Sequence, residues 1–185
     1  MHFGELGNLA FLRPNYAKVV ADLCKELGGM PFLTDCNTLY PGSRKNALEH
    51  MDCANLNGLT PSLQAARSVI GDGLRGTDDV EVPVENAEYC PTARIGRAVM
   101  DADVFISLTH FKGHEATGFG GAIKNIGMGC GSRAGKMAQH NSGKPVNPKQ
   151  TLRGCKRCAK ECGSDAITYP EKKAVIDMIM QGCGV

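Results

Sequence analysis

The residue types best suited to metal chemistry are four cysteines near the C-terminal end of the chain. Cys155, Cys158 and Cys162 follow a C-x2-C-x3-C spacing, and Cys183 lies close to the last residue. Two thiolates separated by two residues can wrap a single metal ion or one edge of a cluster. We therefore predict that Cys155, Cys158, Cys162 and Cys183 are metal ligands.

The spacing of these cysteines indicates an iron–sulfur ancestry. Bacterial ferredoxins use C-x2-C-x2-C-x3-C-P, and this stretch matches the second, third and fourth cysteines of that run. Leu152 stands at the first position, Gly163 replaces the proline, and Met180 stands at the first position of a second run that continues with Cys183. A two-cluster arrangement would give each site two protein ligands, fewer than the four that a cluster needs. We expect a cluster of the [4Fe-4S] type, with zinc or free thiols as the alternatives.

A second group of reactive side chains follows the strand that the apolar pattern predicts at Asp103–Leu108. Ligands of open parallel sheets bind beyond the carboxyl ends of strands, and glycines at that point allow the backbone to approach them closely. Histidine and glutamate side chains suit metal binding or proton transfer, and lysines supply positive charge to a small anionic ligand. The candidate ligand-binding residues of this segment are His110, Lys112, His114, Glu115, Thr117, Gly118, Gly120, Gly121 and Lys124.

The glycine spacing in this segment matches neither the dinucleotide fingerprint nor a Walker A sequence, so it predicts no known nucleotide motif. Three glycines alone would indicate only a tight loop, and a single histidine there is more often a structural loop residue. Their combination with lysines at a strand end favours a site. Near the start of the chain, His2 is a further candidate, with Asp35 and Asn37 after the first strand as its neighbours.

The elements that position these residues alternate between helix and strand, which predicts an α/β fold with a mostly parallel open sheet and helices on both faces. In the first helix, Tyr16, Val19, Val20, Leu23 and Leu27 follow helical spacing. The predicted helices cover Arg13–Gly28, Ser43–Leu56 with Ser43 as its cap, Thr60–Ile70, Thr92–Ala102 and Ala122–Met128. The predicted strands cover Pro31–Asp35, Asp79–Val84, which Pro83 places at an edge, and Asp103–Leu108.

Three parts follow from composition. Residues 1–136 form the α/β domain, 137–150 a polar linker with Pro145 and Pro148, and 151–185 a partial, ferredoxin-like iron–sulfur segment. The chain is 42% hydrophobic, enough to build a core, and its net charge of +2 gives no support for a nucleic-acid or membrane partner. An odd number of cysteines, nine, and the lack of a signal sequence argue against a secreted disulfide protein. We predict a cytoplasmic protein.

Several motifs together resemble the uncharacterised iron–sulfur-centre proteins of domain-of-unknown-function family 362. They are His2-Phe-Gly-Glu5, Phe32–Tyr40, Asp72-Gly-Leu-Arg-Gly76 and the block from His110 to Lys136. The resemblance covers nearly the whole chain and implies an α/β domain joined to ferredoxin-type cysteine runs, without an assigned reaction. Family members usually carry more residues before the first motif and two complete cysteine runs, so this chain resembles a truncated member. A missing strand would expose a sheet edge, which predicts self-association.

Two hypotheses of function follow. In the first, the chain is an iron–sulfur redox protein that exchanges electrons with a redox partner protein or with a small anionic ligand bound near His110–Lys124. In the second, it is a non-redox ligand- or metal-binding module whose tail holds zinc or no metal, or an inactive fragment. Neither hypothesis assigns an enzymatic reaction.

Overall fold

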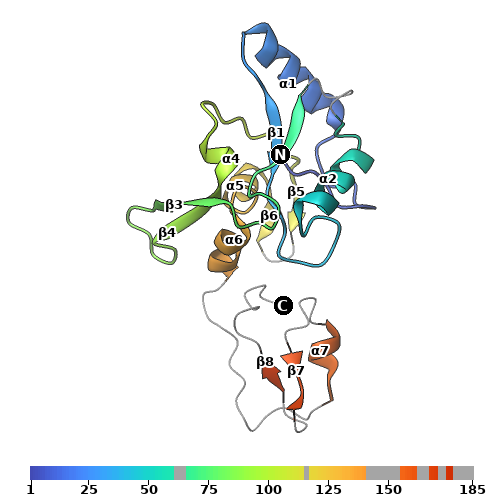
Figure 1. The fold of residues 1–185 in the computed structure, drawn as a ribbon, viewed down its shortest axis with the longest axis vertical. Coiled ribbons are helices and arrows are strands. Elements are labelled where there is room, and N and C mark those ends of the chain that lie inside the picture. Colours follow the sequence, from blue (N-terminus) through green and yellow to red (C-terminus); the bar gives the residue numbers. More distant parts are fainter. Residues whose placement is uncertain (61–65, 115–116, 141–154, 162–166, 171–173, 177–185) are drawn as a thin grey trace.

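The computed structural model describes residues 1–60, 66–114, 117–140, 155–161, 167–170 and 174–176, and it has the α/β class that the sequence predicts (Figure 1). The helices are α1 (Pro14–Glu26), α2 (Ala47–Leu56), α4 (Arg97–Met100), α5 (Ala122–Gly127), α6 (Arg133–His140) and α7 (Arg157–Glu161). The strands are β1 (Phe32–Asp35), β2 (Arg67–Ile70), β3 (Asp79–Pro83), β4 (Thr92–Gly96), β5 (Lys112–His114), β6 (Gly118–Gly120), β7 (Ile167–Thr168) and β8 (Val175–Ile176).

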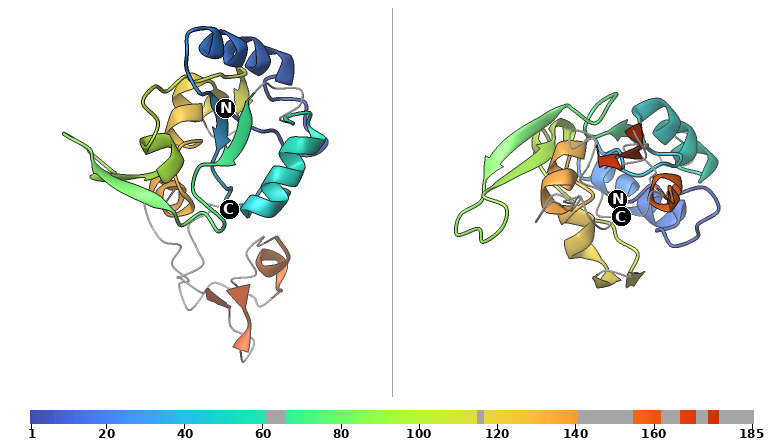
Figure 2. Two further views of the ribbon diagram at one scale, coloured as in Figure 1. Left: turned by 45° about the horizontal axis from the view of Figure 1, so that its top comes forward. Right: turned by 90° about the horizontal axis from the view of Figure 1, so that it is seen from below.

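The strands of the described residues form four two-stranded sheets, so the prediction of one mostly parallel open sheet is not confirmed. Only β1 and β2 pair in parallel, from Phe32 opposite Arg67 to Asp35 opposite Ile70. The pairs β3–β4, β5–β6 and β7–β8 are antiparallel. The β3–β4 pair projects from one side of the body (Figure 2).

The first helix packs on a different face from the one that the apolar spacing suggested. Ala17 and Ala21 are its buried residues, because their small side chains let the helix approach the core closely. The larger apolar side chains lie toward solvent, with Val19 68% and Leu27 80% exposed. The core cluster consists of Phe3, Ala17, Ala21, Leu33, Ala54, Leu59, Ala66 and Ile70.

The start of α2 also differs from the prediction. Asn46, not Ser43, caps this helix, because its side chain accepts hydrogen bonds from the amides of Leu48 and Glu49. The amide of Ser43 instead donates to Glu5. The predicted strands at Pro31–Asp35 and Asp79–Val84 and the predicted helices at the positions of α1 and α5 are confirmed within one or two residues.

Three predicted elements are wrong. The helix at Thr60–Ile70 is replaced by β2 at its C-terminal end, while residues 61–65 lie outside the described part. The helix at Thr92–Ala102 is strand β4 followed by the short helix α4, because residues 92–96 find a partner in β3. Asp103–Leu108 forms no strand, because no described strand lies beside it to complete a ladder, and Val104 is 75% exposed.

The ends of β1, β2 and β4 converge, and this convergence positions the candidate site. A Cβ atom on Gly96 would lie only 2.7 Å from both the carbonyl oxygen of Gly71 and the sulfur of Cys36. The amide of Gly96 donates to Cys130, and that of Ser132 donates to Arg94, which brings the start of α6 against β4. Helix α6 runs from Arg133 to His140 and so includes residues 137–140 of the predicted linker. Residues 141–150 of that linker lie outside the described part.

Candidate functional site

The carboxyl ends of the parallel strands β1 and β2 carry polar residues that bind each other. Asn37 follows β1 and Asp72 follows β2, and both side chains are fully buried. The backbone amide and the side-chain amide of Asn37 each donate to Oδ1 of Asp72 at 2.9 Å. These bonds fix the two strand ends relative to each other, at the edge of a parallel pair where ligands commonly bind.

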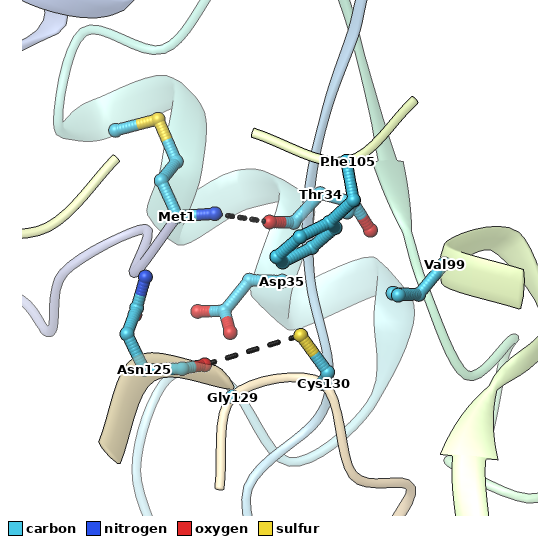
Figure 3. A pocket seen from close by; sticks show the side chains of 8 residues that line it. All are labelled: Met1, Thr34, Asp35, Val99, Phe105, Asn125, Gly129 and Cys130. Carbon is cyan, nitrogen blue, oxygen red and sulfur yellow. Dashed lines mark hydrogen bonds between the residues drawn. The ribbon is translucent and has the colours of Figure 1, made fainter. Parts of the chain in front are cut away.

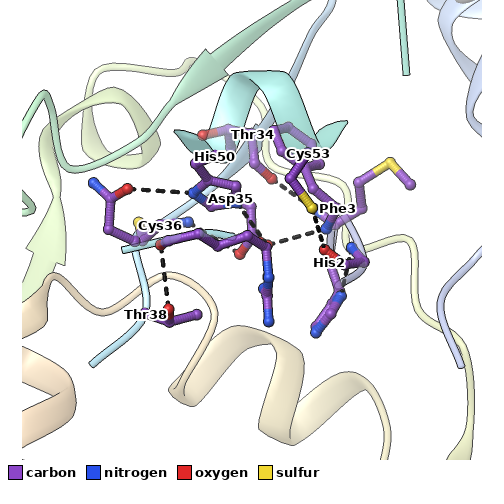
Figure 4. A network of polar contacts seen from close by, with 12 residues as sticks. His2, Phe3, Thr34, Asp35, Cys36, Thr38, His50 and Cys53 are labelled. Carbon is purple, nitrogen blue, oxygen red and sulfur yellow. Dashed lines mark hydrogen bonds and ion pairs between the residues drawn. The ribbon is translucent and has the colours of Figure 1, made fainter. Parts of the chain in front are cut away.

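Asp35, the last residue of β1, is the centre of a buried polar network (Figure 4). Its Oδ2 accepts from the amide of Phe3 at 3.0 Å and lies 3.4 Å from a guanidinium nitrogen of Arg44 and 3.6 Å from Nε2 of His50. Burial would raise the pKa of Asp35, but the contact with His50 and the electrostatic interactions with His2, His50 and Arg44 outweigh it and hold the pKa well below its usual range. Asp35 is therefore ionised and saturated by protein groups, so it can affect a ligand only through its neighbours.

His2 is held next to this network as a neutral imidazole. Its Nδ1 accepts a hydrogen bond from the amide of Gly4 at 2.8 Å, so the neutral ring carries its proton on Nε2. Burial lowers the pKa of His2 to about 4; the Asp35 carboxylate opposes this effect, and the charges of Arg44 and Lys112 reinforce it. Figure 4 shows the ring pointing away from α2. At neutral pH the Nε2–H group is a hydrogen-bond donor.

The segment around His2 is anchored on both sides. The side-chain amide of Asn57 donates to the carbonyl of Phe3 at 2.9 Å, and the thiol of Cys53 donates to the carbonyl of Gly4 at 3.3 Å. Glu5 accepts from the amide of Ser43 at 2.8 Å and pairs with Arg44 at 3.1 Å. Burial of Glu5 would raise its pKa, but its bonds to Ser43 and Arg44 lower it overall. The segment therefore presents His2 from a fixed backbone.

Two lysines lie together where the β5–β6 hairpin meets α5. Lys112 in β5 pairs with the buried Gly120 of β6. A Cβ atom on Gly120 would lie 3.5 Å from Cδ of Lys124 and 3.8 Å from Cγ of Lys112, so both side chains cross this glycine. Burial lowers the pKa of Lys124, and the charges of Lys112 and Lys136 lower it further.

Lys136 of α6 brings a third positive charge, which is buried. The side chain is 8% exposed, and Nζ donates to the carbonyl of Gly131 at 2.5 Å. Its charge acts on Lys124 and on Asp72. Burial raises the pKa of Asp72, which the Asn37 bond and the Lys136 charge only partly offset. We call Lys112, Lys124, Lys136 and His2 the basic cluster.

Tyr40 and His140 lie beside the basic cluster. The phenol oxygen of Tyr40 lies 3.4 Å from Nε2 of His140, and the two rings meet edge to face at 6.1 Å between centroids. Burial lowers the pKa of His140, and the nearby charges of Lys124 and His114 add to this effect. The arrangement therefore places two groups able to transfer protons close to Lys124.

The structure brings only some of the predicted site residues together. Lys112, Lys124, Gly120, His2 and the supporting Asp35 meet at the basic cluster, and His114 lies near its His140 side. The hydroxyl of Thr117 donates within its own turn, to the carbonyl of Phe119 at 2.9 Å. Gly118 occupies the left-handed region at φ 75°, and Gly121 is the N-cap of α5. Glu115 lies outside the described residues. His110 instead lines a surface recess with Leu9, Phe11, Leu12, Arg13, Asn15 and Tyr16.

A small enclosed cavity lies on another side of Asp35 (Figure 3). Its volume of about 10 Å³ is room for roughly one water molecule. It is lined by Met1, Thr34, Asp35, Val99, Phe105, Asn125, Gly129 and Cys130. This cavity is therefore too small for a ligand much larger than water.

In the cysteine segment the structure describes two of the four predicted ligands. Cys155 and Cys158 are exposed, and Lys156 between them has a left-handed φ of 61° that turns the chain. The sulfur of Cys158 lies 2.7 Å from the phenol oxygen of Tyr169, and this hydrogen bond is the main reason that the pKa of Tyr169 rises to about 12. Cys162 and Cys183 lie outside the described residues. Within the described ranges, no three histidine, cysteine or acidic residues form a group that could hold a metal ion.

The chain belongs to the family described as domain of unknown function (DUF362), whose model matches residues 1–181. Over 127 residues, which are 67% of this chain, it is 31% identical to the thylakoid-associated protein sll1697 of Synechocystis sp.. The aligned region spans 34% of that relative, about a third of its length. No solved structure matches the chain. Among the described helices, none is long and apolar enough to cross a membrane.

Proposed function

We propose that the α/β part of this chain binds a small anionic ligand at the basic cluster, and that its cysteine segment holds an iron–sulfur cluster for electron transfer. The observation that supports ligand binding best is the convergence of Lys112 and Lys124 over Gly120. Among the residues that the structure describes, neither lysine has a carboxylate within ion-pair distance. Repulsion between these ammonium groups favours an anion that lies between them.

The other members of the basic cluster suit the same ligand. Lys136 adds a buried charge that water screens little, and His2 adds a neutral donor at a fixed position. The nearby carboxylates do not neutralise the cluster: Asp35 is paired with Arg44, and burial raises the pKa of Asp72. A phosphate or carboxylate group would accept hydrogen bonds from several of these donors at once.

Calorimetric titration with inorganic pyrophosphate at low salt tests the ligand site. The double variant Lys112→Gln/Lys124→Gln should bind about 10-fold or more weakly, because a hydrogen bond to a charged group contributes about 1.5–3 kcal/mol. Lys25→Gln, on the exposed end of α1, is the matched control and should bind as the wild type does. Equal affinity in the double variant and the control would refute the proposed site.

The described cysteines fit a thiolate-bound metal centre. Cys155, just before α7, and Cys158, in the first turn of α7, are both exposed, and both influence Tyr169, so their thiols lie on the same side of the segment. Lys156, Arg157 and Lys160 are nearby positive charges that would offset the negative charge of thiolates. A bound cluster would supply one-electron chemistry, with Cys162 and Cys183 as the further ligands that the sequence predicts.

Oxygen-free reconstitution with iron and sulfide tests the cluster. We expect visible absorbance that dithionite bleaches, with iron and sulfide in the protein. Cys155→Ser and Cys158→Ser should lose this absorbance, whereas Cys24→Ser in α1 should keep it. Colourless, correctly folded wild-type protein would refute the cluster.

The second candidate is a non-redox binding module whose C-x2-C turn holds zinc. The observation that favours it is that two exposed thiols with C-x2-C spacing, at the start of α7, suit a four-cysteine zinc site equally well. Bound zinc without iron or sulfide in oxygen-free material would identify this candidate. The ligand site at the basic cluster is common to both candidates.

A further inference from the structure

The amine of Lys124 combines two features that distinguish it from a surface lysine. Its side chain is half-buried in the first turn of α5 and crosses Gly120, where a Cβ atom would come into van der Waals contact with it at 3.5 Å. Lys112 crosses the same glycine from the neighbouring strand. Lys124 is therefore held in place beside a second ammonium group instead of extending into solvent.

These surroundings favour the neutral form of the Lys124 amine. Burial and the charges of Lys112 and Lys136 all lower the pKa of Lys124, so a larger fraction is unprotonated at a given pH. A lysine in such a cationic and partly desolvated position is a nucleophile toward carbonyl carbon. The neighbouring ammonium groups also attract the anionic end of a substrate to the amine.

Groups that can move protons lie beside this amine. His140 is close enough to Lys124 for their charges to interact, and its Nε2 contacts the phenol of Tyr40 at 3.4 Å. Loss of water from a carbinolamine needs a proton on the departing oxygen, which a histidine or tyrosine can supply.

We propose that Lys124 forms an imine with an aldehyde or ketone that also carries a phosphate or carboxylate group; this inference rests on the anion site proposed above. The nitrogen lone pair of Lys124 forms a bond to the carbonyl carbon. The nitrogen gives up its two protons while the carbonyl oxygen takes up two, and the carbon–oxygen bond breaks to release water and leave the carbon–nitrogen double bond. Lys112 holds the anionic group of the same molecule, the buried charge of Lys136 attracts it from behind, and His140 with Tyr40 relays the protons from nitrogen to oxygen. The step needs no oxidant or reductant.

Pyridoxal 5′-phosphate, an anionic aldehyde, is the probe for this inference, with borohydride reduction to trap the imine. Mass spectrometry of peptides should show Lys124 labelled several-fold faster than Lys25, since a lowered pKa raises the unprotonated fraction of Lys124 and the ammonium group beside it attracts the phosphate of the probe. Pyrophosphate should protect Lys124. Lys124→Arg, which keeps the charge but has no reactive amine, should lose the fast phase of labelling, and Lys25→Arg should retain it.

The outcomes separate the two proposals. If pyrophosphate binds in the calorimeter but Lys124 is labelled no faster than Lys25, the imine is refuted and the anion site stands. If pyrophosphate neither binds to the protein nor protects Lys124 from labelling, the anion site is refuted, and the inference that rests on it is refuted as well. Circular dichroism of each variant shows whether a lost signal reflects lost structure. Fast, protectable labelling of Lys124 with measurable pyrophosphate binding supports both.

Discussion

The buried neutral state of His2 predicts how the stability of the protein depends on pH. The pKa of His2 is about 4 in the folded protein, against 6.5 for an unperturbed histidine. Between pH 7 and pH 4 the unfolded chain takes up a proton on this residue, while the folded chain does not. Acid therefore favours the unfolded state, and the free energy of unfolding falls by about 2 kcal/mol between pH 8 and pH 5 on account of His2 alone. Below pH 4 both states are protonated and this contribution becomes constant.

The variant His2→Gln isolates the effect, because its side-chain oxygen can still accept from the Gly4 amide but has no proton to bind. Urea unfolding at pH 8 and pH 5 should show the variant losing about 2 kcal/mol less than the wild type between the two pH values. His140 and Glu5 also destabilise the fold in acid, through pKa values below their ordinary ones, and their effects cancel in the comparison. If both proteins lose the same free energy, His2 is not held neutral and the reasoning about its environment is wrong.

Three further predictions concern packing and the buried network. Gly96→Ala should lower the free energy of unfolding by about 2 kcal/mol in thermal or urea unfolding, because the new Cβ would lie 2.7 Å from atoms of Gly71 and Cys36. The control Gly113→Ala, which has open space around the new Cβ, should change it by less than about 0.5 kcal/mol. Val19→Ser, on the exposed face of α1, should have a free energy of unfolding within about 0.5 kcal/mol of that of the wild type. Ala21→Leu, on the buried face, should lower it by about 1–3 kcal/mol. The reverse ranking would place the buried face of α1 elsewhere. Asn37→Ala should lower the free energy of unfolding by about 1–3 kcal/mol in the same assay, because it leaves Oδ1 of Asp72 without its side-chain donor. Asn8→Ala, in the exposed turn, should lower it less. Equal losses in the two variants would count against the buried network.

The sequence predicted best the elements whose signals are local. Helix α1 has a proline in its first turn and glycines after its end, and β1 is a short apolar run between turns. Residues 92–96 were mistaken for helix because their strand conformation depends on β3, which is not adjacent in sequence. The opposite error occurred at 103–108, where a strand-like apolar pattern has no described partner strand. Strand formation depends on a neighbour that single-sequence patterns do not specify.

The same limit applies to the candidate site. Lys112, Lys124, His2 and Asp35 were predicted, because each follows a strand or lies in a compact motif. Lys136, His140 and Tyr40 were not assigned to the site, since α6 and the loop after β1 meet it only in three dimensions. The signal for Lys136 in the sequence was a lysine at the end of a glycine-rich stretch, which the structure shows to lie within α6. The strand expected before His110 does not form, and His110 lines a separate surface recess.

The tie between Asn37 and Asp72 has a consequence for dynamics. These residues close the ends of β1 and β2 next to the basic cluster, so the loops that approach a ligand cannot open without loosening the central strand pair. Occupancy of the site should therefore reach the interior of the protein: amide protons of Leu33 to Asp35 and of Ser68 to Ile70 should exchange with deuterium more slowly when pyrophosphate is bound.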